Sequence, residues 1–243
     1  MLTEMALYSC IKVIGLFRRK TGMMRRLNIK IMGIITQGIL GPVTGRTGPV
    51  VSYFRFGKNI VRSVSNSQKN KIETPARKRQ REKIKVCNGF TKAFTGTGFF
   101  NKSFPAYGDS GSGYNRATSA LMNLAIISNP ETAIAWPKAL VSKGPVAAVD
   151  FASAAINEEG DIMFSWTDNA GTGTAKGDDK AILVAYFTES KEAVYSFSTA
   201  TRRDGVAILE MNSKKGTVET WIGFLSADEK NAANSVYTGT INL

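Results

Sequence analysis

Aromatic and basic side chains are interleaved in one short stretch of the chain. The stretch contains Tyr53, Arg55, Phe56, Lys58 and Arg62. Proteins that bind nucleic acid use such surfaces, because cations neutralise phosphate while aromatic rings stack on bases. The same residues also fit ordinary cross-strand packing in a half-buried hairpin. The stretch therefore predicts either a nucleic-acid-binding surface or a structural hairpin, and the sequence leaves both open.

A second basic cluster follows about twenty residues later, where Arg77, Lys78 and Arg81 stand among further lysines and arginines up to Lys85. A helix with this face could follow a phosphate backbone. The alternative is a solvated helix surface. Positive charge at the start of a helix opposes the macrodipole, which is a small cost that a partner could offset.

The residue types exclude most catalytic chemistry. The chain has no histidine, so a Ser-His-Asp triad, a Cys-His pair and a histidine-bound metal are all absent. Its two cysteines, Cys10 and Cys87, cannot form a disulfide scaffold. We therefore expect a protein that is not an enzyme and that has no catalytic residue and no cofactor, and only carboxylate, lysine or tyrosine chemistry leaves a histidine-free enzyme open.

An acidic cluster also fails as a metal site. Asp168, Asp178 and Asp179 flank a loop rich in glycine and threonine, and clustered carboxylates can bind Ca²⁺. Their spacing is not that of an EF-hand, and Lys176 and Lys180 lie among them. The loop also lacks the Lys-Ser/Thr ending of a phosphate-binding loop. We expect no metal here.

Charge is placed unevenly along the 243 residues. Residues 1–86 contain 19 Lys/Arg and 3 Asp/Glu, whereas residues 87–243 contain 13 and 16, so the first third supplies all of the net charge of +13. A basic chain attracts anionic partners. Residues 5–17 are apolar except for Ser9 and Lys12 and precede a basic run, the reverse of a secretory signal, and the apolar run is too short to span a bilayer.

From that order we expect residues 1–31 to be a non-native or flexible extension, with translation starting at Met32 and without membrane contact; an interfacial basic helix is the alternative that stays open. The absence of a secretory signal predicts a cytoplasmic protein, and non-classical export stays open.

The elements that position these residues can be read from local patterns. Residues 50–56 and 59–64 are predicted strands of a hairpin around Gly57-Lys58. Thr74-Pro75 is a typical helix start, and the helix should run to Val86 or Cys87. Residues 95–113 are predicted to be a loop, and residues 114–126 a second helix with Leu121, Leu124 and Ala125 in the core.

From residue 139 onwards short alternating strands and turns succeed one another, beginning with residues 140–144. This pattern predicts an antiparallel fibronectin-III or immunoglobulin-like sandwich with Trp166, Phe187 and Trp221 in one core. The expected fold class is α+β and mostly β, with a basic hairpin and helical region at 32–138 followed by the sandwich at 139–243.

Several segments resemble one bacterial family of unknown function. They are MGIITQGILGPVTGRTGPVV, FGKNIVRS, TPARKRQREK, the stretch Met163–Gly173 and WIGFLSADEKNAANSVYTG. The resemblance covers about residues 32–240, and its opening and closing blocks are the most specific. Family members are about 200 residues long and typically begin at the position of Met32. Region 90–113 departs most from the family pattern. The resemblance implies an architecture but no activity, substrate or catalytic residue.

These observations favour a non-enzymatic interaction or structural protein, in which the sandwich supplies stability and contacts a protein partner or a second copy. The alternative is a nucleic-acid-associated protein that binds phosphate through the basic hairpin and helix.

Overall fold

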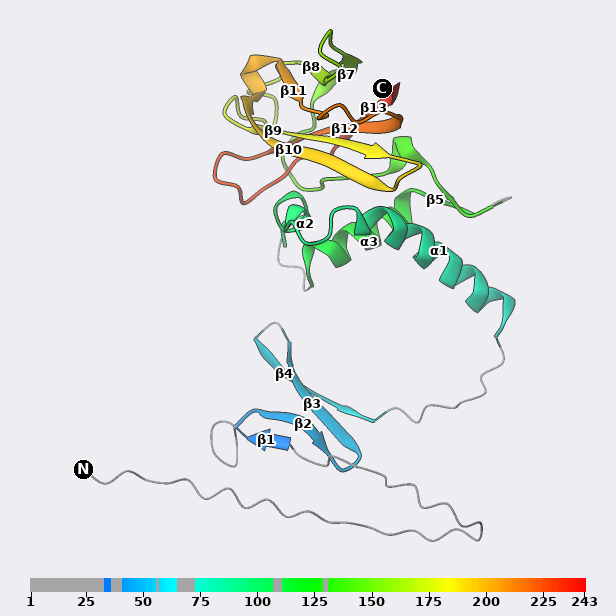
Figure 1. Cartoon of the computed structure of the whole chain (residues 1–243). Coiled ribbons are helices and arrows are strands. Elements are labelled where there is room, and N and C mark those ends of the chain that lie inside the picture. The colour runs from blue at the N-terminus through cyan, green and yellow to red at the C-terminus, as the bar shows by residue number, and fades with distance from the viewer. Residues whose placement is uncertain (1–32, 36–40, 56, 65–72, 107–110, 129–130) are drawn as a thin grey trace, which may run out of the picture. The chain divides into compact units, whose positions relative to one another are not determined.

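The computed structural model describes residues 33–35, 41–55, 57–64, 73–106, 111–128 and 131–243. Over these residues the chain is mostly β, with three α-helices and several antiparallel sheets (Figure 1). It divides into two compact units, Met1–Lys69 and Asn70–Leu243. The predicted boundary at residue 139 lies inside the second unit.

The first unit contains a four-stranded antiparallel sheet in the order β1-β2-β3-β4. The turns after β2 and β3 place Gly48 and Gly57 at φ +58° and +73°, a region that glycine enters without steric cost. The predicted hairpin is confirmed, with Lys58 at the start of its second strand. The strands are β1 (Gly33–Ile35), β2 (Val43–Thr47), β3 (Val50–Arg55) and β4 (Lys58–Ser63).

The second unit begins with helix α1 (Pro75–Lys92). The Thr74 side chain caps it by accepting a hydrogen bond from the Arg77 amide at 3.3 Å, and proline occupies its first turn, as predicted. The helix continues past its predicted end at Cys87, because Cys87, Phe90 and Thr91 are buried and packing extends the helix.

Two shorter helices follow. Helix α2 (Phe99–Ser103) lies within the stretch predicted to be a loop, so that prediction is wrong there: Phe99, Phe100 and Phe104 are buried and hold this turn against the sheet. Helix α3 (Gly113–Leu124) confirms the second predicted helix. Leu121 and Ala125 are in the core as expected, whereas Leu124 is 49% exposed.

Two larger sheets form the rest of the second unit, one in the order β10-β9-β12-β13 and one in the order β11-β8-β7, and every pairing is antiparallel. The strands are β7 (Asp150–Ile156), β8 (Ile162–Thr167), β9 (Lys180–Phe187), β10 (Glu192–Thr201), β11 (Val206–Leu209), β12 (Thr217–Leu225) and β13 (Val236–Asn242). The small elements are β5 (Ile126–Ile127), β6 (Ala133–Ile134) and the 3₁₀ turns η1 (Trp136–Lys138) and η2 (Arg202–Asp204).

The expected first strand at residues 140–144 is wrong. This segment is fixed by single hydrogen bonds to the chain before β13: the Val141 amide donates to Ser235 Oγ at 2.9 Å, and Ser142 Oγ donates to the Ala233 carbonyl at 2.8 Å. The first strand of the region is instead β7, whose alanine-rich sequence gives a weak β signal.

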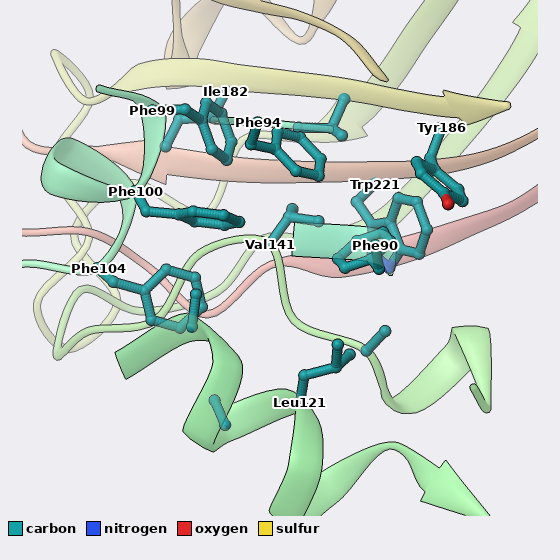
Figure 2. Packing of buried hydrophobic residues seen from close by; sticks show 14 of the residues in the cluster. Phe90, Phe94, Phe99, Phe100, Phe104, Leu121, Val141, Ile182, Tyr186 and Trp221 are labelled. Atoms are coloured by element: carbon teal, nitrogen blue, oxygen red, sulfur yellow. The ribbon is translucent and has the colours of Figure 1, made fainter. Parts of the chain in front are cut away.

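The β10-β9-β12-β13 sheet is buried on both faces, which makes the second unit three layers deep (Figure 1). Helices α1 to α3 cover one face, and Figure 2 shows Phe90, Tyr186 and Trp221 meeting there with four further phenylalanines. Ring centroids of Phe90 and Tyr186 lie 4.8 Å apart, within the range in which aromatic pairs attract.

The other face packs against β11-β8-β7. Trp166 and Phe187 lie in this second core, and the Trp166 ring meets Phe224 at 5.5 Å. Trp221 does not join them. It pairs with Val184 across β12 and β9, so it shares Val184's face and points to the helices. The expectation of one core with both tryptophans is therefore wrong, because the central sheet has two apolar faces.

Candidate functional site

Four of the predicted binding residues share one face of the first unit's sheet. In the β3–β4 register Tyr53 is opposite Ile60, Arg55 is opposite Lys58, and Arg62 is opposite Val51. Side chains of directly paired residues point to the same side, and alternate residues along a strand do too. Tyr53, Arg55, Lys58 and Arg62 therefore lie together, with the Arg62 guanidinium 5.8 Å from the Tyr53 ring centroid.

Sequence reasoning missed a fifth member of this surface. Arg46 on β2 is opposite Val51, so the register adds it to the same side, in one row with Val51 and Arg62. Its Nε donates to the Gly48 carbonyl at 3.1 Å. We call Arg46, Tyr53, Arg55, Lys58 and Arg62 the basic face. Phe56 was also predicted to belong to it and lies outside the described residues.

The three predicted residues of the basic helix lie on α1 in the other unit. Arg77, Lys78 and Arg81 are exposed, and Arg81 pairs with Glu73. The predicted residues that the structure describes are therefore divided between the two units, and each unit has one basic surface.

A groove of about 1120 Å³ runs beside α1. One wall is α1 from Arg79 to Lys92, and the other includes β6, η1 and the end of β9. Trp136 contributes aromatic surface, whereas Tyr186 lines the groove but is almost fully buried, and this burial raises the pKa of its hydroxyl above the ordinary value. We call this the α1 groove. The buried Cys87 on the same helix has a raised thiol pKa, which keeps it protonated and unreactive.

A third surface is the solvent side of the β11-β8-β7 sheet. Ile208, Met163 and Ala155 form one row across its three strands, and Val206, Ser165 and Ser153 form the next. Ile208 is 52% exposed, and the outward side chains of both rows are uncharged. We call these six residues the outer face.

Phe151 stands at a bulge of β7, the edge strand next to this face. It is 89% exposed, and its φ of +50° lies in the left-handed region that bulky side chains avoid. The register shifts between Asp150 and Ser153, and such bulges turn side chains in new directions. An exposed aromatic ring on a strained backbone is a feature that folding alone does not explain.

The acidic loop that could have held Ca²⁺ has a structural role instead. Asp179 is buried and pairs with the buried Arg202, which donates from Nη2 at 3.2 Å and from Nε at 3.3 Å. Arg202 also donates to Asn169 Oδ1 at 2.6 Å, and its carbonyl accepts the Trp166 indole N–H. Across the described residues no cluster of carboxylates and cysteines has metal-binding geometry.

Burial lowers the pKa of the Arg202 guanidinium, and the attraction of Asp179 opposes this shift. Arginine stays charged in proteins, so the pair joins the acidic loop to the end of β10 as a buried ion pair. Sequence reasoning missed it, although Lys180 and Thr201 are opposite in the β9–β10 register, which makes Asp179 and Arg202 neighbours.

The fold defines an antiparallel β-protein with a helical layer on one sheet. A family model described as "Family of unknown function (DUF6266)" matches residues 35–239, and the chain belongs to this family. This confirms the resemblance found in its opening and closing segments. The comparison with curated proteins finds no match. Among the described residues no helix is both long enough and apolar enough to cross a membrane.

Proposed function

We propose that the protein is a non-enzymatic interaction protein whose second unit self-associates through the outer face. The observation that carries this proposal is the contiguous exposed row of Ile208, Met163 and Ala155, on a sheet whose edge strand β7 also carries the exposed Phe151. Contiguous exposed apolar surface usually marks a site of protein association, whereas single exposed apolar residues do not.

The occupant is a second copy of the chain. The outer face has no charge, so a copy of itself covers it without desolvating an ion. The second unit, residues 70–243, contains 20 Lys/Arg and 18 Asp/Glu, so two copies of this unit repel each other little. A two-fold dimer would place the same uncharged rows of both copies in contact.

The architecture proposed with this function is a fibronectin-III-like sandwich. When β7 to β13 are counted as seven successive strands, the first, second and fifth form one sheet and the third, fourth, sixth and seventh form the other. This is the strand distribution of a fibronectin type III module, and Trp166 lies between the two sheets. Such sandwiches commonly serve as scaffolds for contacts between proteins.

Sedimentation velocity of the full chain tests the proposal. Ile208→Asp introduces a charge within the outer face, on its β11 strand, and Thr199→Asp introduces the same charge at an exposed position of β10. We expect the wild type and Thr199→Asp to dimerise with rising concentration and Ile208→Asp to stay monomeric. A wild-type chain that is monomeric at all concentrations, or an Ile208→Asp chain that still dimerises, contradicts the proposal.

A second candidate function is nucleic-acid binding, which the basic face favours. Four cations share one face of the sheet with the Tyr53 ring, so phosphates and an unpaired base have partners on the same surface. Four phosphate contacts predict a slope of about −3 in log affinity against log salt for a single strand. Tyr53→Ala should weaken single-strand binding more than duplex binding, because stacking needs unpaired bases.

Charge reversal on either side of the same sheet provides the control. Arg62→Glu changes the basic face, whereas Ser63→Glu changes an exposed position on the opposite face. We expect Arg62→Glu to flatten the salt slope more than Ser63→Glu. Charge reversal at Arg77, Lys78 and Arg81 tests separately whether helix α1 contributes to nucleic-acid binding. If the wild-type protein binds neither single-stranded nor double-stranded nucleic acid at about 50 mM salt, this candidate function is excluded.

A further inference from the structure

The α1 groove is long and positively charged. Its α1 wall runs from Arg79 to Lys92, which is about 20 Å at 1.5 Å per residue. Arg79, Lys85 and Lys92 line it from the helix, and Lys191 lines it from the turn after β9. Within the described part of the chain, none of these four has an ion pair. The groove therefore suits an elongated anionic ligand.

Gly89 lies in the interior of α1 and lines this groove. Glycine is less favourable than alanine in a helix interior. A Cβ at Gly89 would meet no atom within 4 Å, so intramolecular packing does not require glycine here. At Gly113, in contrast, a Cβ would lie 1.9 Å from the Phe100 carbonyl oxygen. Glycine at a surface position is useful where another molecule must approach the backbone closely.

The groove fits a peptide better than a nucleic acid. Glu82 and Glu131 are among its lining residues, and these carboxylates oppose a ligand with a phosphate at every unit. The rings of Phe90 and Tyr186 are 2% and 3% exposed, so they offer little face for stacking bases. A peptide can place carboxylates beside the lysines and apolar side chains beside Trp136 and Ile134.

We propose that the α1 groove binds an acidic, partly apolar peptide segment of a partner protein, with the peptide backbone lying close to Gly89. About six residues in extended form match the 20 Å wall. Lys85, Lys92 and Lys191 pair with its carboxylates. This site is separate from the outer face, so the proposal does not depend on self-association.

Fluorescence anisotropy with the full-length protein tests the site. The probe is a labelled peptide of about eight residues that alternates Glu and Leu, and the comparison probe is a labelled oligo(dT) of similar length. We expect the peptide to bind at about 50 mM salt and Lys85→Glu to weaken it at least about tenfold. Lys78→Glu is the matched control, because Lys78 is exposed on α1 but does not line the groove.

Gly89→Ala separates binding from folding. We expect it to raise the melting temperature by about 1–4 °C, because alanine favours the helix, and to weaken peptide binding at least about tenfold. Three results would overturn the proposal: no peptide binding to the wild type, unchanged binding to Gly89→Ala, or a lowered melting temperature of Gly89→Ala. Oligo(dT) binding that is lost in Lys85→Glu, without peptide binding, would assign the groove to nucleic acid instead.

Discussion

Arg202→Met tests whether the buried ion pair holds the second unit together. The guanidinium donates twice to Asp179, once to Asn169 and once to the Ala147 carbonyl, and its Cζ lies 4.2 Å from the Phe224 ring centroid. Methionine fills much of the same volume but makes none of these hydrogen bonds.

The expected loss follows from what remains after the substitution. Asp179 is 1% exposed and its Oδ1 already has no hydrogen-bond partner among the described residues. Without Arg202 its charge is buried and uncompensated, which costs about 3–5 kcal/mol. At about 2–4 °C per kcal/mol for a chain of this size, the melting temperature should fall by roughly 6–20 °C.

Urea unfolding followed by tryptophan fluorescence measures the effect, because Trp166 bonds directly to the Arg202 carbonyl. Arg203→Met is the control: Arg203 is the exposed neighbour, and its replacement should cost less than about 0.5 kcal/mol. Adding Asp179→Leu to Arg202→Met removes the unpaired charge and should recover at least about 1 kcal/mol. A loss below about 1 kcal/mol for Arg202→Met, or no recovery in the double variant, would refute this reasoning.

Three further predictions concern stability. Gly113→Ala should destabilise the protein by at least about 1 kcal/mol in urea unfolding, because its Cβ would overlap the Phe100 carbonyl; an unchanged midpoint would contradict this. Burial raises the pKa of Tyr186, so the contribution of its neutral hydroxyl to the free energy of unfolding is present below about pH 10 and lost at higher pH. Tyr186→Phe should therefore flatten the fall in stability above pH 10, and an equally steep fall would be evidence against it. Hydrogen bonds from the Thr201 amide and hydroxyl lower the pKa of Asp204. The contribution of the Asp204 carboxylate to the free energy of unfolding is therefore present above about pH 4 and lost as pH falls. Asp204→Asn should lessen the loss of stability in acid, measured by unfolding at pH 3 to 6, and an unchanged acid profile would exclude this role.

Features that depend on neighbouring residues could be predicted from the sequence. The Thr74-Pro75 pair gives α1 its start, and Gly57 gives the β3–β4 hairpin its turn. Alternation alone placed Tyr53 and Arg55 on one side of a strand. Arg46 joins them only through the pairing of β2 with β3, which the sequence does not specify.

Features that depend on long-range packing could not be predicted. β9 is apolar on both sides, so alternation could not show that Trp221 faces helices while Phe187 faces the second sheet. Helix α2 has five residues, too few for a helical period. The bulge that exposes Phe151 is likewise set by the pairing of β7 with β8.

Fluorine NMR of the full chain with 4-fluorophenylalanine at position 151 tests the central claim most directly, because Phe151 is 89% exposed in the single chain and stands on β7, the edge strand that contributes to the outer face. The account predicts a resonance that shifts with protein concentration in the wild-type background and stays constant in Ile208→Asp. If the wild-type resonance has the same position at low and at high protein concentration, self-association through this face is contradicted.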